Sequence, residues 1–300
     1  MTINKKNIFS SLIFITSFML IVYFIKKIDY EKFKLLFLSF NNNLFIASYL
    51  ICIIQTLLNV KKFNLLSLNQ VDNKKLSKIF FISSFLNFIL PFKLGEIKKI
   101  YLLKKNFNIN YKKSVEIMIV DKVFEIIFYI FFSVFIFSFL GSIESIFIYL
   151  VTFLSLIGLL FFKKIIFFLS NKKISIFQTI KKIILKYTVE FYNLKKVIFY
   201  NILTILLTFI HFKIFLTFLN IENLSILNII SFVSLISIIG FIPVTYNGLG
   251  FREFFILLIF GQLFTLEHII LIGVFFISRV IPSAIVGLFL LIESYIKNNF

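Results

Sequence analysis

Long apolar runs separated by short polar segments dominate the chain. Most runs approach the ~20 residues that a helix needs to cross the hydrocarbon core of a bilayer, and none shows the strict alternation of a membrane β-barrel. A backbone surrounded by lipid must satisfy its own hydrogen bonds, which a helix does within one segment. We therefore predict an all-α polytopic integral membrane protein with about six full spans, at residues 8–25, 44–60, 114–140, 146–162, 197–219 and 268–292.

Two further segments are interrupted, and we predict that each forms a re-entrant hairpin. In the first, residues 79–113, a twelve-residue and largely apolar run ends at Pro91 and is followed by Gly95 and Glu96. Twelve residues make about 18 Å of helix, which is too short to cross. A crossing would also place the seven lysines of 93–113 on the wrong side of the membrane. Proline removes a helical hydrogen bond, so Pro91 marks the turn.

The second interruption lies in residues 226–264. An apolar arm ends at Pro243, the polar turn after it contains Asn247, Gly248 and Gly250, and a second apolar arm follows. The pattern leaves open whether the first of these arms spans or re-enters. Broken helices in corresponding positions of two halves are typical of transporter-like folds that bind their substrate near the midplane. An inverted repeat is therefore an open alternative for this chain.

Composition agrees with a membrane protein and limits its chemistry. Hydrophobic residues make up 60% of the chain, which no water-soluble domain requires. The net charge of +19 is spread between apolar runs, so we expect anionic membrane lipids and not nucleic acid as the partner. A single cysteine, Cys52, excludes an intramolecular disulfide and a cysteine metal cluster. We find no nucleotide or metal motif and expect no cofactor and no metal; His211 and His268 are expected to be packing or interfacial histidines.

The lysines predict the orientation of the spans. Cationic loops stay on the cytoplasmic side, and 21 of the 30 lysines lie in three segments, 61–78, 93–113 and 163–196. Segments 141–145 and 220–225 contain no cation and are assigned to the outside. This topology places both termini in the cytoplasm and the protein in the plasma membrane. Segment 26–42, which has mixed charges, fits it least well.

Four stretches of the sequence together resemble one known family. In order, they are "LPFKLGEIKKIYLLKK", "VDKVFEIIF", "IPVTYNGLGFREFFILLIFG" and "SRVIPSAIVGL". The ordered set is similar to the hallmarks of the lysylphosphatidylglycerol synthase transmembrane family, also called flippase-like domain proteins, over nearly the whole chain. The family often has Glu-Arg where this chain has Asp121-Lys122, which keeps the charge signs but loses the guanidinium fork.

This resemblance implies an inner-membrane protein that handles lipids or lipid-linked glycans. In the aminoacyl-phospholipid synthases of the family, a soluble C-terminal domain transfers the aminoacyl group while the membrane domain moves the product lipid. Here the sequence ends at "IESYIKNNF", a few residues after the last predicted span. We therefore expect no aminoacyl transfer by this chain alone.

Charged residues inside membrane segments are candidate functional groups, because inserting each one costs about 2.5 to 3.5 kcal/mol. Asp121, Lys122 and Glu125 lie within about one helical turn, and Lys122 is placed to reach Glu125. They form either a structural ion pair near the interface or part of a cavity wall. Glu96 is either a helix N-terminal carboxylate or the partner of Lys122 or Arg252 at a gate. Four lysines are expected to form an exposed interfacial face: Lys98, Lys99, Lys104 and Lys105.

The two arginines are the candidate headgroup ligands, together with the turn residues Asn247, Gly248 and Gly250. Arg252 comes directly after that turn, where free backbone N–H groups and a guanidinium are able to grip a phosphate; a salt bridge with Glu96 or a neighbouring helix is the alternative. Arg279 lies in mid-span and is expected to line a polar cavity. Charge balance or gating is assigned to Glu96, Asp121, Lys122, Glu125 and Glu253.

These features predict a translocator or carrier for an anionic phospholipid or a polyprenyl-phosphate-linked glycan, with no catalytic residue assigned. Two alternatives stay open. One is a membrane-embedded glycosyl or aminoacyl transferase that uses Glu96 or Asp121 as general base. The other is a non-catalytic partner of a separately encoded lipid- or glycan-modifying enzyme, which docks through the basic segment 163–196.

Overall fold

A computed structural model describes residues 42–133 and 191–296, apart from short gaps, and a few residues between 26 and 34. Every element in the described part is an α-helix, which confirms the predicted fold class. The helices are α3 (Asn42–Leu66), α4 (Asn73–Ile89), α5 (Leu94–Phe107), α6 (Tyr111–Ser133), α10 (Phe191–Phe218), α11 (Ile226–Phe241), α12 (Phe251–Phe260), α13 (Leu266–Ser278) and α14 (Ile281–Ile296). Outside the described residues lie spans 8–25 and 146–162, the end of span 114–140, most of segment 163–196, and Pro91, Pro243, Asn247, Gly248 and Gly250.

Three of the described stretches are long and apolar enough to cross a membrane: Ile46–Leu66, Lys195–Phe218 and Leu266–Ile296. They coincide with three of the predicted spans. Helix α6 is not among them, because charged residues interrupt its apolar run. A full span at 114–140 therefore stays a prediction.

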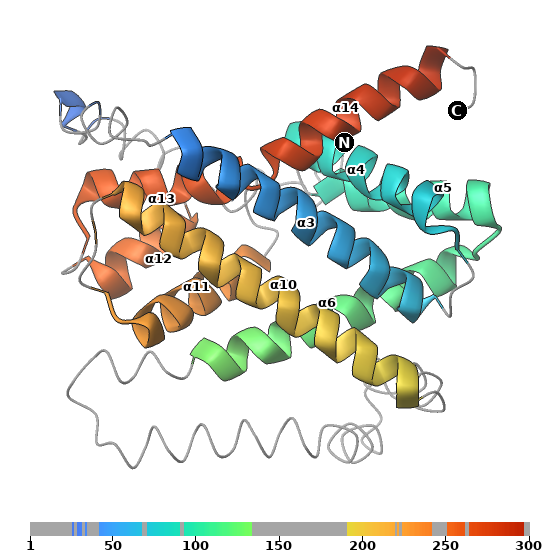
Figure 1. Cartoon of the computed structure of the whole chain (residues 1–300), viewed down its shortest axis with the longest axis horizontal. Helices are drawn as coiled ribbons and strands as arrows, with labels where there is room; N and C mark the ends of the chain where they lie inside the picture. The colour runs from blue at the N-terminus through green and yellow to red at the C-terminus, as the bar shows by residue number, and fades with distance from the viewer. Residues whose placement is uncertain are drawn as a thin grey trace, which may run out of the picture.

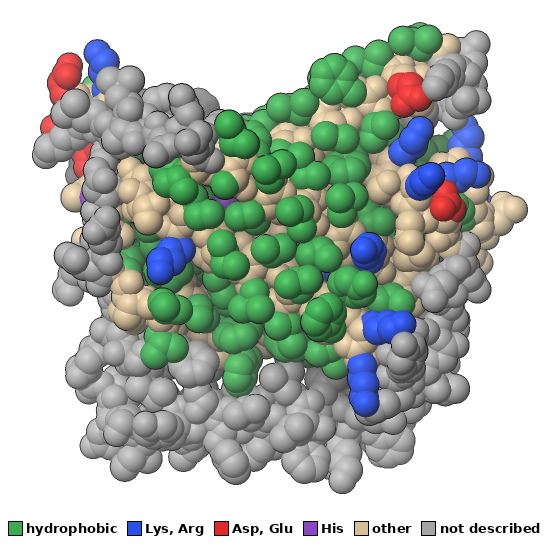
Figure 2. Space-filling model, in the orientation of Figure 1, with side chains coloured by type: hydrophobic (Ala, Val, Ile, Leu, Met, Phe, Trp, Pro, Cys, Tyr) green, Lys and Arg blue, Asp and Glu red, His purple; other side chains and the backbone are tan. Residues whose placement is uncertain are grey.

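Helices α3 and α10 form the long diagonal pair in the middle of Figure 1 and pack side by side. Apolar side chains at helical spacing lie on their outer faces, among them Ile46, Leu50 and Ile54 on α3 and Phe199 and Ile210 on α10, and all five are exposed. Figure 2 shows a broad hydrophobic surface over this region. Soluble monomeric proteins rarely expose such a large apolar surface to water, whereas a helix face in contact with lipid is expected to be apolar.

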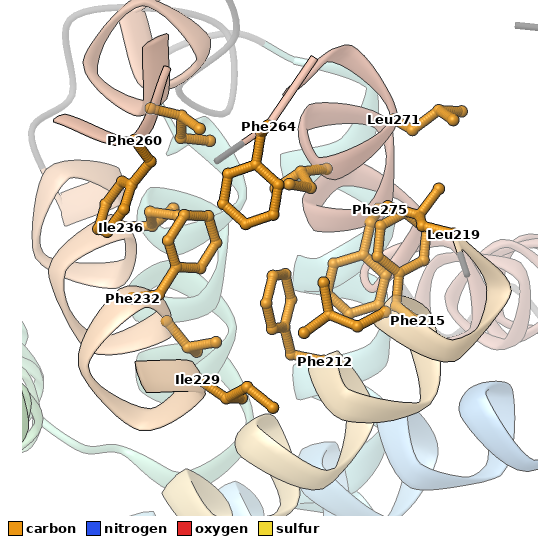
Figure 3. Close-up of a cluster of buried hydrophobic side chains, with 14 of the residues drawn as sticks. Phe212, Phe215, Leu219, Ile229, Phe232, Ile236, Phe260, Phe264, Leu271 and Phe275 are labelled. Atoms are coloured by element: carbon orange, nitrogen blue, oxygen red, sulfur yellow. The ribbon is translucent and has the colours of Figure 1, made fainter. Parts of the chain in front are cut away.

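Two buried hydrophobic clusters hold the helices together. The first is rich in phenylalanine and joins α10, α11, α12 and α13; Figure 3 shows Phe212, Phe232 and Phe275 pointing toward one another within it. The rings of Phe215 and Phe275 stack with centroids 4.3 Å apart. The second cluster joins mainly α3, α4, α5 and α6 around Phe63 and Leu103, and it also includes Val197 of α10. Tyr129 of α6 belongs to the first cluster, so each cluster contains residues from both halves of the chain.

The first predicted hairpin is present as the antiparallel pair α4 and α5, with corrected boundaries. Helix α4 begins at Asn73, because Asp72 caps it by accepting a hydrogen bond from the backbone N–H of Lys75. The first arm therefore has 17 residues, about 25 Å of helix, and is longer than the twelve predicted. Whether this pair re-enters the membrane stays a prediction.

The glycine of this hairpin has a different role from the one that the sequence suggested. Lys93, not Gly95, adopts the left-handed conformation at the turn, with φ of 54°. Gly95 lies in the first turn of α5, where a Cβ would collide with the backbone oxygen of Ser83 and with the side chain of Asn87. The hydroxyl of Ser83 donates to the Gly95 carbonyl at 2.9 Å. Gly95 is thus required for the close approach of the two arms and not for the break.

The predicted span 268–292 is two helices, α13 and α14, separated by a turn at Arg279 and Val280. Pro282 explains the break, because it has no N–H to donate to the preceding turn and its ring crowds the carbonyl four residues earlier. Figure 1 shows α14 leaving the line of α13 at this point. The break places Arg279 at a turn and not inside a regular helix.

Gly287 controls the packing of α14 on α4, and its replacement is a test of the fold. A Cβ at this position would collide with the carbonyl oxygen of Phe81 and would lie 3.0 Å from Cβ of Phe85. We expect Gly287→Ala to lower the free energy of unfolding by about 1 to 3 kcal/mol, measured by thermal unfolding in detergent. Gly240→Ala is the control, since the nearest atom to its Cβ would be 4.0 Å away. Equal stability of the two variants would contradict this packing.

Candidate functional site

A cavity of about 260 Å³ lies beside the phenylalanine-rich cluster, from which Tyr129, Ile205 and Ile236 contribute to its wall. Six helices contribute to its wall, namely α3, α6, α10, α11, α12 and α13, together with the two turn residues Lys93 and Arg279. The lining residues are Gln55, Asn59, Lys93, Lys122, Glu125, Tyr129, Thr204, Ile205, Thr208, Ile236, Ser237, Gly240, Arg252, Phe276 and Arg279. Polar side chains therefore collect in one place among helices that are otherwise apolar.

Cations outnumber carboxylates in this lining. Lys93, Lys122, Arg252 and Arg279 contribute four positive charges and Glu125 contributes one negative charge, so these residues have a formal net charge of +3. Charges surrounded by apolar helices interact more strongly than charges in water. A cavity walled in this way attracts an anion.

Arg279 lines the cavity, as the sequence predicted, but its partners are neutral. Its Nη2 donates to the hydroxyl of Thr208 at 3.1 Å and to Oε1 of Gln55 at 3.4 Å. The amide of Gln55 donates in turn to Thr208 Oγ1 at 3.0 Å and to the carbonyl of Thr204 at 3.1 Å. The guanidinium is thus oriented by a polar network between α3 and α10.

Arg252 lies at the start of the second arm of the second interrupted segment and is also part of the cavity wall. It lies in the first turn of α12, is 6% exposed, and places its guanidinium 4.6 Å from the ring centre of Phe276. Phe276 is also 5.9 Å from the guanidinium of Arg279, so one ring packs near both arginines. Glu253 is buried but does not line the cavity; its carboxylate occupies the space that a side chain at Gly273 would need.

Residues that flank the two chain interruptions meet at the cavity. Lys93, in the turn of the first hairpin, donates from Nζ to the carbonyl oxygen of Gly240 at 3.3 Å. Gly240 belongs to α11, the first arm of the second hairpin, and Arg252 belongs to its second arm. All three residues line the cavity. The sequence separation between the bonded residues is 147, so only the tertiary fold brings the two breaks together.

A buried lysine that the sequence did not single out organises the acidic residues of α6. Lys62 of α3 has no exposed side-chain surface, and its Nζ lies 2.8 Å from Asp121 and 2.9 Å from Glu125. It also donates to Oδ1 of Asn201 at 3.2 Å. Glu125 contacts Lys122 at 2.7 Å with its other oxygen, as predicted. The sequence grouped Lys62 with the basic loop segment 61–78, but this lysine lies within α3 and is buried.

Glu96 has a different partner from the two that the sequence suggested. Its carboxylate pairs with Lys99 at 2.5 Å, one helical turn away, and accepts from the amide of Asn87 at 3.3 Å. Lys99 is buried, with Nζ 4.4 Å from the ring centre of Phe80. The expectation that Glu96 pairs with Lys122 or Arg252 is therefore corrected, as is the exposed position expected for Lys99. A gating role for Glu96 stays a prediction.

The sequence matches one known protein family over most of its length. This family, described as the lysylphosphatidylglycerol synthase TM region, matches residues 7–290. The chain belongs to this family. No curated protein and no solved structure gave a match. The protein is accordingly a membrane protein of a lipid-related family.

The lysylphosphatidylglycerol synthase TM-region match extends over all the cavity residues, including several that our sequence reasoning missed. Four of the missed cavity residues, Gln55, Asn59, Thr204 and Thr208, belong to two polar stripes whose members lie three, four or seven positions apart within apolar helices. The stripe on α3 is Ser48, Gln55, Asn59 and Lys62, and the stripe on α10 is Asn201, Thr204, Thr208 and His211. The stripes face each other in antiparallel register, since Ser48 hydrogen-bonds His211 and Lys62 bonds Asn201. Polar residues repeated at this spacing inside a span were the available signal.

His211 and Cys52 are buried side by side, whereas His268 is half-buried near the start of α13. His211 is buried against Cys52 and the ring of Phe275, whose centre is 4.4 Å from that of the imidazole. His268 contacts the hydroxyl of Thr265 at 3.2 Å. Within the part of the chain that the structure describes, no three His, Cys, Asp or Glu side chains are grouped so that they could hold a metal ion.

Proposed function

We propose that this protein translocates or carries a membrane lipid with an anionic headgroup, and that the headgroup binds in the cavity beside Arg252 and Arg279. The observation that carries the proposal is the concentration of four cations and one carboxylate in one cavity among apolar helices. Charged groups inside a membrane protein usually mark a substrate pathway. A phosphate is the anion that best matches two guanidinium groups.

The size of the cavity supports a headgroup as the bound part. Pockets for whole drug-sized molecules have volumes of roughly 300 to 1,000 Å³, and this cavity has about 260 Å³. The cavity is therefore smaller than a pocket for a whole drug-sized molecule. A headgroup with its phosphate fits a cavity of this size, while the lipid tails remain in the bilayer. An anionic phospholipid and a polyprenyl-phosphate-linked glycan share this chemistry, and we propose the lipid phosphate as the common recognised group.

The ion pairs beside the cavity supply a way to exchange charge when the lipid enters. Lys122 and Glu125 both line the cavity, and Glu125 also contacts the fully buried Lys62. A lipid phosphate that takes Lys122 from Glu125 leaves that carboxylate paired with Lys62. The displaced carboxylate therefore remains compensated, which avoids the cost of a buried unpaired charge.

Reconstitution in vesicles tests the proposal directly. Purified protein is incorporated into phosphatidylcholine vesicles that contain fluorescent phosphatidylglycerol or, in a second arm, a fluorescent polyprenyl-phosphate glycan, and dithionite bleaches the outer leaflet. We expect the protected inner-leaflet fraction of one of these lipids to fall faster than in protein-free vesicles. Fluorescent phosphatidylcholine is the matched neutral control and should move no faster with protein. Protein-containing vesicles that match protein-free ones in both anionic arms would sink the proposal.

A transferase is less well supported by the described residues than a carrier. Glu96 and Asp121, the general bases suggested for it, are both ion-paired, and neither lines the cavity. We therefore assign no catalytic residue. We further propose that the protein acts in the plasma membrane with both termini in the cytoplasm, which the distribution of lysines supports.

A further inference from the structure

A second hollow, of about 510 Å³, lies between α4, α5 and α14. Each helix contributes one face at the spacing of a helical turn. The lining residues are Lys75, Lys78, Ile79 and Ile82 of α4, Leu102, Lys105 and Asn106 of α5, and Leu290, Glu293 and Ser294 of α14. We call this hollow the α14 groove. It shares no residue with the cavity beside the arginines.

The groove lies beside the packing contact of α14 with α4. At Gly287 the two backbones are so close that a Cβ would collide with the carbonyl oxygen of Phe81. The lining residues of α14, Leu290, Glu293 and Ser294, follow this close contact in sequence. Lys78 of α4 lies 3.8 Å from Glu293, so the two helices border the groove from opposite sides.

The groove is apolar at its base and cationic at its rim. Ile79, Ile82 and Leu102 are at most 4% exposed and belong to the hydrophobic cluster beneath. Three exposed lysines surround them, Lys75, Lys78 and Lys105. Lys78 also lies 3.8 Å from Glu293, so the four charged groups have a formal net charge of +2. Figure 2 shows Lys and Glu side chains gathered near the end of α14.

We propose that the α14 groove binds one anionic phospholipid, with its phosphate at the three lysines and an acyl chain along the apolar base. The charge at the rim matches an anionic headgroup, and lysines near the membrane surface attract such lipids. On the outer side of α14, Phe289 is 67% and Ile292 is 45% exposed, which is expected of a helix face that lies in lipid. The mouth of the groove is therefore bordered by bilayer and not by water alone.

The absence of tryptophan from the sequence makes this site directly measurable. Leu290→Trp places a single fluorophore in the groove, and Phe289→Trp places one on the neighbouring lipid-facing side. Each variant is reconstituted in vesicles of phosphatidylcholine and phosphatidylglycerol, in which one lipid or the other has brominated acyl chains. We expect brominated phosphatidylglycerol to quench Leu290→Trp more strongly than the mixing ratio predicts, with a preference on the order of tenfold for two net charges. For Phe289→Trp, both lipids should quench in proportion to their amounts.

Charge variants decide whether the lysines cause the preference. Adding Lys75→Gln, Lys78→Gln and Lys105→Gln to Leu290→Trp should reduce the preference to about one. The matched control removes three exposed lysines outside the groove, Lys61, Lys112 and Lys213, and should retain it. Retention of the preference in the first triple variant would overturn the proposal. Equal quenching of Leu290→Trp by both lipids would also overturn the proposal, whether the groove then proved to hold a protein segment or free phosphate. Inorganic phosphate added to the vesicles tests for the free phosphate.

The lipid proposed here is a bound lipid of the α14 groove and not the transported one. The quenching measurement needs no transport, and the groove variants leave every residue of the arginine cavity unchanged. Failure of the vesicle transport assay would therefore leave this proposal standing, and failure of the quenching preference would leave the proposed function standing.

Discussion

Vesicles that contain the double variant Arg252→Gln, Arg279→Gln are expected to move the anionic lipid at least 100-fold more slowly than vesicles with the unmodified protein. Both guanidinium groups border the cavity, and one ring, Phe276, packs near both. Hydrogen bonds to a charged group contribute about 1.5 to 3 kcal/mol each. Loss of the hydrogen bonds from both guanidinium groups therefore removes roughly 3 to 6 kcal/mol of headgroup binding free energy. Because about 1.4 kcal/mol corresponds to a factor of ten in an equilibrium constant, this loss amounts to at least about 100-fold. The measurement is the dithionite protection assay with fluorescent lipid.

The matched control for this prediction removes two positive charges elsewhere. Lys61→Gln, Lys213→Gln changes the net charge equally, and neither lysine lines the cavity. We expect its transport rate to remain within about twofold of the unmodified protein, because exposed charges are screened. Thermal unfolding of both double variants verifies that they are folded. Equal transport by the folded arginine variant and the control would refute a headgroup site at the arginines.

The replacement Lys62→Met is expected to destabilise the protein by about 3 to 5 kcal/mol, the usual cost of removing one partner from a buried ion pair. Lys62 is fully buried, and the side chains of Asp121 and Glu125 that it contacts are only 15% and 13% exposed. Glu125 retains Lys122, so the larger part of the cost falls on Asp121. Methionine keeps most of the side-chain volume, so the effect reports the charge. Thermal unfolding in detergent measures it.

A double-variant cycle separates this charge effect from packing. Lys62→Met, Asp121→Asn also neutralises the largely buried carboxylate that lost its lysine, and we expect recovery of a substantial part of the lost stability. Lys61→Met is the control at the adjacent, exposed position, where a change within about 0.5 kcal/mol is expected. If Lys62→Met unfolds at the same temperature as Lys61→Met, the buried network does not stabilise the fold as described.

Much of the fold was accessible from local patterns in the sequence. Helices at 44–60 and 197–219 followed from apolar runs, and the ends of α4 and α11 followed from the prolines after them. The pairing of Lys122 with Glu125 followed from helical spacing. Errors occurred where a local pattern had more than one solution. The start of α4 was placed too late because the capping of Asp72 was not considered, and Pro282 was not used to divide the last span.

The candidate site was accessible only in part, and the reason is physical. Composition and periodicity by themselves determined a helical membrane protein with two interrupted elements, since these features depend on transfer free energy and on hydrogen bonds between residues close in sequence. The partners of its charges were decided by the tertiary structure. Lys62 meets Asp121 from 59 positions away, and Lys93 meets Gly240 from 147. Which charges meet inside a membrane depends on how whole helices pack, and no spacing along the chain contains that information.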